Sequence, residues 1–99
     1  MILVVGSVVA KQGQLDALLA LGIAHVARSR TEPGCLSHAV HRDVENPLRL
    51  VFVERWADAA ALAAHFALPA SREFVKAAAA LADGRPEIDV FEAKAVRIG

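Results

Sequence analysis

The segments of this chain that favour β-structure are apolar on both alternating sets of positions. Residues 2–10 read Ile-Leu-Val-Val-Gly-Ser-Val-Val-Ala, and in residues 48–56 the apolar Leu50 and Phe52 alternate with Val51. Successive side chains of a strand point to opposite faces of a sheet, so both faces of these strands need a cover. A single layer of helices covers only one face. We therefore expect the second face to be buried against another copy of the chain, in a homodimer.

The length and the composition lead to the same expectation. The 99 residues suffice for a single domain, 1–99, and 56% of them are hydrophobic. A domain of this size buries only about 60–65% of the surface that its unfolded chain exposes. A sequence this apolar therefore predicts an oligomer with an apolar cavity.

Local signals divide the chain into strands and helices. Pro33-Gly34 is typical of a turn, Asp58 is suited to accept hydrogen bonds at a helix N-terminus, and Gly84-Arg85-Pro86 is typical of a helix end. Pro69 interrupts the second helical region, which restarts there. The expected elements are strand 2–10, helix 15–30, strand 35–42, strand 48–56, helix 59–67, helix 69–82 and strand 87–96.

The order of these elements is β-α-β-β-α-β, with the break in the second helical region at Pro69. This order is typical of α+β proteins with a ferredoxin-like fold, in which a four-stranded antiparallel sheet carries all helices on one face. We therefore predict this fold class.

The charge balance argues against several classes of partner. Lys and Arg together number 11, as do Asp and Glu, so no net charge attracts nucleic acid or an anionic membrane. No apolar run approaches the roughly 20 residues that a membrane span needs, and no secretory signal is recognisable, so we expect a cytoplasmic location. The single cysteine, Cys35, allows no internal disulfide.

The four histidines raise the question of a metal site. His38 and His41 lie three residues apart in an expected strand and therefore point to opposite faces. His25 and His65 belong to separate expected helices, without a cysteine or a carboxylate pair to complete a ligand set. We therefore predict no metal. The chain also has no glycine-rich phosphate-binding motif, so we expect no cofactor.

The junction between strand 48–56 and helix 59–67 carries the most reactive side chains. Glu54 and Trp56 point the same way from the strand, and His65 lies at the edge of the apolar stripe of the helix. A histidine at that boundary can face a cavity. Alternatively, His65 only interacts with the last turn of its helix, and Trp56 only fills the core.

A set of short motifs follows in a fixed order along nearly the whole chain. The set consists of Glu32-Pro33-Gly34-Cys35, Glu54-x-Trp56-x-Asp58, Leu62 and His65, Pro69 and Phe74, and Pro86-Glu87-Ile88. In this order and spacing it resembles the antibiotic biosynthesis monooxygenase family of small dimeric α+β barrels. The set is more specific for the fold of that family than for one activity within it.

The resemblance implies a homodimer of ferredoxin-like subunits, with a mostly apolar pocket between the sheet and the helices of each subunit. The family includes cofactor-free oxygenases of polycyclic phenols and quinol oxidases of the same build, in which the substrate supplies the electrons. The function implied is therefore a cofactor-independent monooxygenase that oxidises an aromatic quinol or phenol with O2 in the apolar pocket.

The resemblance also suggests roles for individual residues. His65 is the candidate base, Glu54 orients or polarises nearby groups, and Trp56 forms a wall of the pocket. The first strand has Gly6 and Ser7 where haem-degrading relatives have an asparagine, so haem is not expected. The side chains expected to bind the substrate are Phe52, Leu62, Phe66 and Phe74.

Two other functions remain open from the sequence. The same barrel without turnover would be a binding module for a small hydrophobic molecule. A relative of similar pattern isomerises a phosphorylated sugar, and that activity would need a phosphate site in the pocket.

Overall fold

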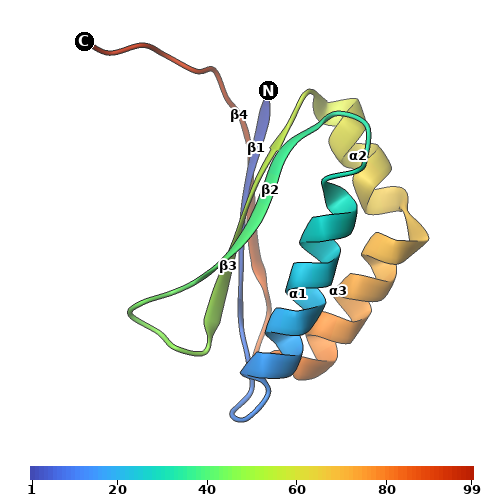
Figure 1. The fold of residues 1–99 in the computed structure, drawn as a ribbon, viewed down its shortest axis with the longest axis vertical. Coiled ribbons are helices and arrows are strands. Elements are labelled where there is room, and N and C mark those ends of the chain that lie inside the picture. The colour runs from blue at the N-terminus through green and yellow to red at the C-terminus, as the bar shows by residue number, and fades with distance from the viewer.

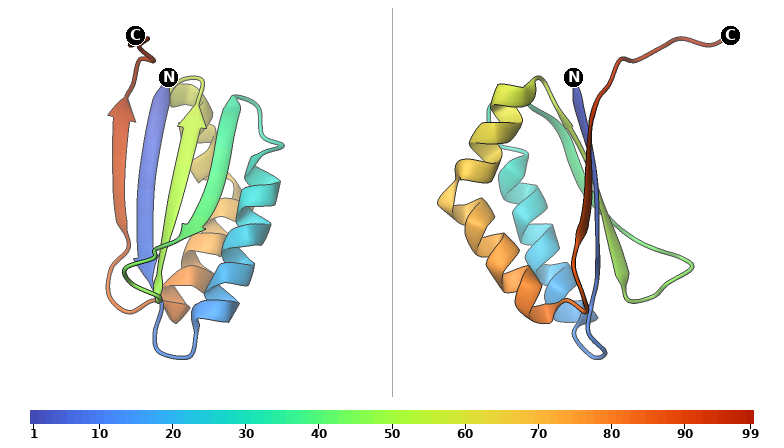
Figure 2. Two further views of the ribbon diagram at one scale, coloured as in Figure 1. Left: turned by 60° about the vertical axis from the view of Figure 1, so that its left-hand side comes forward. Right: turned by 180° about the vertical axis from the view of Figure 1, so that it is seen from behind.

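The chain forms a four-stranded antiparallel sheet with three helices on one of its faces (Figure 1). The computed structural model describes residues 1–99. In the view from behind in Figure 2, the helices lie on one side of the sheet and the other side is free. None of the helices is both long and apolar enough to span a bilayer. The elements are β1 (Ile2–Val9), α1 (Leu15–Ser29), β2 (Cys35–Arg42), β3 (Arg49–Trp56), α2 (Ala59–Ala67), α3 (Pro69–Leu81) and β4 (Glu87–Glu92).

The strand order is β2-β3-β1-β4, and each neighbouring pair is antiparallel. The first and second strands of the sequence are therefore separated in space by the third, which is the arrangement of ferredoxin-like α+β folds. The predicted fold class is confirmed. Helix α1 packs against β2 and α3, so the helical layer covers one side of the sheet.

Strand β3 alternates between the two faces of the sheet as the sequence predicts. Leu50, Phe52, Glu54 and Trp56 are buried beneath the helices. Because a strand turns every second side chain to the same face, this pattern places an acid and the only indole next to the hydrophobic core. The core itself divides into one cluster around Leu50 and Phe52 and a smaller one around Trp56.

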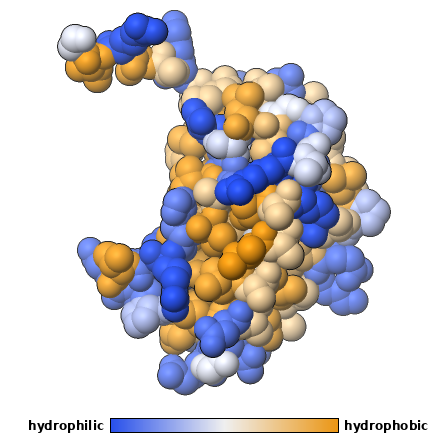
Figure 3. Space-filling view, in the orientation of Figure 1, coloured by the Kyte–Doolittle hydropathy of each residue, from blue (hydrophilic) through white to orange (hydrophobic).

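The face of the sheet turned away from the helices is apolar and has no cover within the chain. Val5, Val51 and Val53 are half-buried on this face, and Phe91 in β4 is exposed. In Figure 3, hydrophobic residues extend to the border of the molecule where Figure 1 shows the sheet in profile. Apolar side chains on both faces of the sheet are thus confirmed, whereas the second molecule on this face stays a prediction.

The last strand is shorter than the sequence pattern predicts. Strand β4 ends at Glu92 rather than at Val96. Its ladder partner is β1, and Glu92 already lies opposite Ile2, the first residue of that strand. The amide of Ala93 donates one further backbone hydrogen bond, to the carbonyl of Met1. The predicted extension was wrong because β-propensity needs the backbone of a neighbouring strand, and β1 ends there.

Helix α1 approaches the sheet closely at Gly22. A methyl group at this position would lie 3.0 Å from Cζ of Phe52. The absent side chain lets the Phe52 ring lie directly against the helix backbone, which outweighs the low helix propensity of glycine.

The turn before β2 is pressed against α2 at Gly34. This residue has a φ of 82°, and a side chain there would place its Cβ 2.5 Å from Cβ of Ala61. The Gly34 carbonyl also accepts a hydrogen bond of 2.8 Å from the amide of Ala57. Only glycine meets both conditions, and the tight fit of this turn holds Glu32, two residues earlier, beside α2.

We expect Gly34→Ala to lower the free energy of unfolding by about 2–4 kcal/mol, because it adds an overpacked contact to the strain of a positive φ. Gly13→Ala is the matched control, since Gly13 has a φ of 81° and no atom within 4 Å of an added Cβ. It should cost only about 1–2 kcal/mol. Urea unfolding of both variants measures the difference, and equal losses would contradict the packing argument.

Candidate active site

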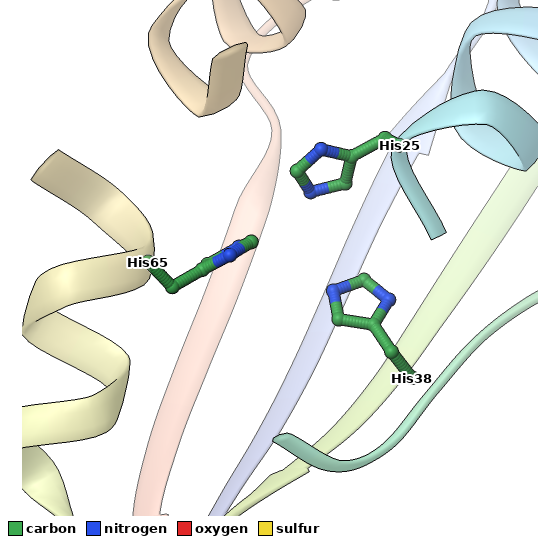
Figure 4. Close-up of side chains that lie close together, drawn as sticks. All are labelled: His25, His38 and His65. Carbon is green, nitrogen blue, oxygen red and sulfur yellow. The ribbon is translucent and has the colours of Figure 1, made fainter. Parts of the chain in front are cut away.

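Three histidines from three different elements meet between the sheet and the helices. His25 comes from α1, His38 from β2 and His65 from α2, and all three side chains are buried. One ring nitrogen from each lies within 4.8 Å of those of the other two. Figure 4 shows the three rings arranged around a common space.

The sequence interpretation kept His25 and His65 apart on separate helices, and the structure corrects it. His38 lies opposite Glu54 in the ladder and faces the helices, where α1 and α2 both pass over it. A signal for His25 was available, since it follows the buried Leu18 and Gly22 at helical spacing. The meeting point itself depends on how three elements pack, which no local pattern contains.

Trp56 and His38 surround the carboxylate of Glu54. The Trp56 indole donates its Nε1–H to Glu54 Oε1 over 2.9 Å, and His38 Nε2 lies 3.2 Å from the same oxygen. The His38 contact lacks the direction of a hydrogen bond, so both ring nitrogens of this buried histidine remain without a hydrogen-bond partner. Burial raises the pKa of Glu54, but the contacts with His38 and Trp56 outweigh it and hold that pKa below its ordinary value.

His65 is oriented by Glu32, a residue that the sequence reasoning included in a motif but gave no role. The distance between His65 Nδ1 and Glu32 Oε1 is 2.7 Å. An ionised carboxylate only accepts hydrogen bonds, so Nδ1 carries the proton and neutral His65 has its free lone pair on Nε2. The turn at Gly34 fixes the carboxylate, and hence the tautomer of the imidazole.

His25 is oriented by packing and by Arg28. Its ring stacks on Phe74 with centroids 4.0 Å apart and an interplanar angle of 6°. Arg28 Nη2 lies 3.0 Å from His25 Nδ1, and the hydroxyl of Ser29 donates to the His25 carbonyl over 2.6 Å. Burial, together with the positive groups around it, lowers the pKa of His25 from 6.5 to about 3, so the ring is neutral at physiological pH.

A cavity of about 240 Å³ lies between the sheet and the helices, beside these groups. Three phenylalanine rings contribute to its walls, and the polar side chains include His25, His65 and Glu54. Beyond His65 lies a second hollow of about 340 Å³, whose lining contains Glu32 but no aromatic residue other than His65. The aromatic cavity is the better candidate for a substrate site, because aromatic walls with a few convergent polar groups are typical of ligand pockets.

The substrate-binding residues expected from the resemblance divide into two groups. Phe52, Phe66 and Phe74 line the cavity. Leu62 does not: it packs with Trp56 in the smaller core cluster, because the apolar stripe of α2 faces the sheet there. Trp56, expected as a pocket wall, is not among the residues that line this cavity: its side chain is fully buried, and its N–H donates to Glu54.

Comparison with known proteins identifies the family. The family model for antibiotic biosynthesis monooxygenases matches residues 1–77, which include the three clustered histidines. The chain belongs to the antibiotic biosynthesis monooxygenase family. The resemblance drawn from the sequence motifs is therefore confirmed.

Relatives of known structure share the whole fold of this family member. A protein of the same family name from Deinococcus radiodurans has a TM-score of 0.94 at 27% identity, covering 100% of this chain and 99% of the other. PA3566 from Pseudomonas aeruginosa has a TM-score of 0.85 at 30% identity, covering 95% of this chain and 94% of the other.

A longer relative was found by sequence. The uncharacterized protein sll1783 from Synechocystis is 32% identical over 91 residues, which are 92% of this chain but only 62% of that longer protein.

We expect His25 to make this family member lose stability on acidification. Its pKa of about 3 in the folded chain lies below its ordinary value of 6.5, so between these pH values the unfolded chain binds more protons. The free energy of unfolding should therefore fall, by up to about 1.4 kcal/mol per pH unit, as the pH drops through this window. Urea unfolding at several pH values should give a shallower fall for His25→Gln than for the wild type. Parallel curves would show that His25 is protonated in the folded state.

Proposed function

We propose that this protein is a cofactor-independent monooxygenase that oxidises a small aromatic quinol or phenol with O2. The observation that supports this most is the pairing of His65 with Glu32 at the wall of an aromatic cavity. The Glu32 carboxylate stabilises the imidazolium that forms when His65 accepts a proton, which is the arrangement of a general base. The cavity of about 240 Å³ is small for a ligand pocket and fits one or two fused rings.

The proposed reaction uses electrons from the substrate alone. The substrate hydroxyl donates its proton to Nε2 of His65, and the resulting phenolate is electron-rich enough to reduce O2 directly. One oxygen atom enters the ring, the other leaves as water, and a quinol becomes a hydroxyquinone. The apolar walls Phe52, Phe66 and Phe74 exclude bulk water from the reacting pair.

Glu54 completes the polar side of the cavity, and Trp56 holds the Glu54 carboxylate in place. The indole N–H fixes one carboxylate oxygen of Glu54, so Trp56 is a positioning residue in this proposal. A carboxylate held in this way can orient a second hydroxyl group of a quinol by accepting its hydrogen bond.

The polar groups in and beside the cavity favour this proposal over the two other functions. A pure binding module would need the same aromatic walls, but it gives no reason for the Glu32–His65 pair. A sugar-phosphate isomerase would need cationic groups, and neither lysine nor arginine lines this cavity. The oxidation of an aromatic hydroxyl compound therefore accounts for more of the site.

We expect His65→Gln to reduce O2 consumption with a panel of quinols and phenols by about 100- to 10,000-fold, because it removes the general base. The matched control is Glu73→Gln, which changes an exposed residue of α3 outside the cavity and should consume O2 at the wild-type rate. Product analysis should find one atom of labelled oxygen in the quinone. Equal rates for His65→Gln and the wild type would remove His65 from the reaction.

We also propose that two copies of the chain pair through the apolar sheet face. Val53 lies near the centre of this face, opposite Val5 of β1 on one side and Ala39 of β2 on the other. A dimer that buries this face would cover the half-exposed apolar residues that the helices leave free.

Sedimentation at micromolar concentration should show a dimer for the wild type and a monomer for Val53→Asp, because the substitution would bury an unpaired charge in the interface. The control Ala63→Asp adds the same charge to an exposed position of α2 and should remain dimeric. A monomeric wild type would contradict the proposal.

A further inference from the structure

His25 lies on the wall of the same cavity but takes no part in the reaction proposed above. Its position is fixed on several sides, by the stacked ring of Phe74, by Arg28 and by the hydroxyl of Ser29 at its carbonyl. No motif in the sequence assigns it a role. Such fixation of a buried polar ring is typical of a group that must present one atom in one direction.

Arg28 determines which nitrogen of His25 carries the proton. A guanidinium has only donors, so Arg28 Nη2 donates its hydrogen bond to Nδ1 of His25 over 3.0 Å. With Nδ1 as the acceptor, the proton of the neutral ring must be on Nε2. Figure 4 shows a ring nitrogen of His25 turned toward the space between the three rings.

His65 has the opposite tautomer. Glu32 accepts from Nδ1 of His65, so the free Nε2 of that ring is an acceptor. The hydrogen bonds of Arg28 and Glu32 thus give the two imidazoles complementary character toward the cavity, one as donor and one as acceptor. Besides burial, His38, His65 and Arg28 disfavour the protonation of His25, and Glu54 favours it.

The spacing of these rings fits one oxygen atom between them. One ring nitrogen of His25 lies within 4.8 Å of one of His65. A hydroxyl oxygen with hydrogen bonds of about 2.8 Å to two nitrogens, at an angle near that of a bent O–H group, joins atoms about 4.4–4.6 Å apart, which is inside this limit. The hydroxyl would donate to one imidazole while accepting from the other.

We propose that His25 is a catalytic hydrogen-bond donor that holds the reacting oxygen of an aromatic hydroxyl substrate through its Nε2–H. His65 removes the proton from this oxygen, and the negative charge that remains is stabilised by the bond from His25. The inference rests on the proposed function, and it names the substrate class more closely: aromatic compounds whose hydroxyl group ionises in the cavity. Arg28 is then a positioning residue, because it acts only by fixing the tautomer of His25.

Three buried histidines could also bind a divalent transition metal. To bind the metal, Nε2 of His25, which faces the other two rings, would have to be unprotonated. A metal-bound histidine usually donates its other ring N–H to an acceptor, whereas Arg28 places a donor and a positive charge at Nδ1 of His25. The hydrogen bond from Arg28 therefore favours the hydroxyl substrate, and metal binding becomes an outcome of the test.

The test uses 4-nitrophenol, whose phenolate is coloured, as a probe in the intact protein. Spectral titration of the bound probe should show a pKa below that of free nitrophenol. We expect His25→Phe, which keeps the ring stacked on Phe74 but has no donor, to raise the pKa of the bound probe by about one to two units. Arg28→Met should give a smaller rise, and Arg72→Met, at an exposed arginine of α3, should give none.

The outcomes separate this inference from the proposed function. The inference is overturned if the wild type does not bind nitrophenol. It is also overturned if the pKa of bound nitrophenol in both His25→Phe and Arg28→Met equals that in the wild type. A lowered pKa without O2 consumption for any quinol would uphold the inference and contradict the monooxygenase. Should His25→Phe fail to fold by circular dichroism, the comparison of Arg28→Met with Arg72→Met decides. The inference would also be overturned if the wild type bound one equivalent of Co²⁺ with micromolar affinity and the single variant His25→Gln did not.

Discussion

The rest of this structure depends on the need of buried polar side chains for hydrogen-bond or charge partners. Three imidazoles and a carboxylate lie under the helices, where an isolated charge would cost several kcal/mol. Glu54 is compensated by the indole of Trp56, and His65 by Glu32. Both ring nitrogens of His38 lack a hydrogen-bond partner, and so do the second oxygen of Glu32 and the hydroxyl of Ser71. These polar groups occupy one region of an otherwise apolar interior, and that region borders the cavity.

Backbone packing determines where these partners stand. The close approach of α1 at Gly22 sets the Phe52 ring, and the turn at Gly34 sets Glu32 against α2. In both places a glycine lets two elements approach more closely than any side chain would permit. The groups proposed to be catalytic are thus carried by helices and strands, as a preorganised site requires. The same rigidity makes the tautomers of His25 and His65 properties of the fold.

The sequence predicted the elements more completely than the site. Hydrophobic periodicity and turn residues located the strands and helices to within one residue, except that β4 ends at Glu92 and not at Val96. Glu54, Phe52 and His65 could be placed on the correct side because strand and helix periods fix their direction. Trp56 and Leu62 pack in the smaller core cluster and do not line the cavity, because the depth of a side chain depends on which elements pack against it. The Glu32–His65 pair spans 33 residues of sequence and follows from no local rule.

The sequence by itself determined the two-faced apolar strands, the order of elements and the motifs of the antibiotic biosynthesis monooxygenase family. These features rest on short-range periodicity and turn chemistry, which each segment carries alone. Only the tertiary structure decided that His25 and His38 join His65, and that Arg28 and Glu32 give His25 and His65 opposite tautomers. The physical reason is that a proton's position on an imidazole depends on whether its neighbour donates or accepts, and these neighbours meet only when the helices dock on the sheet.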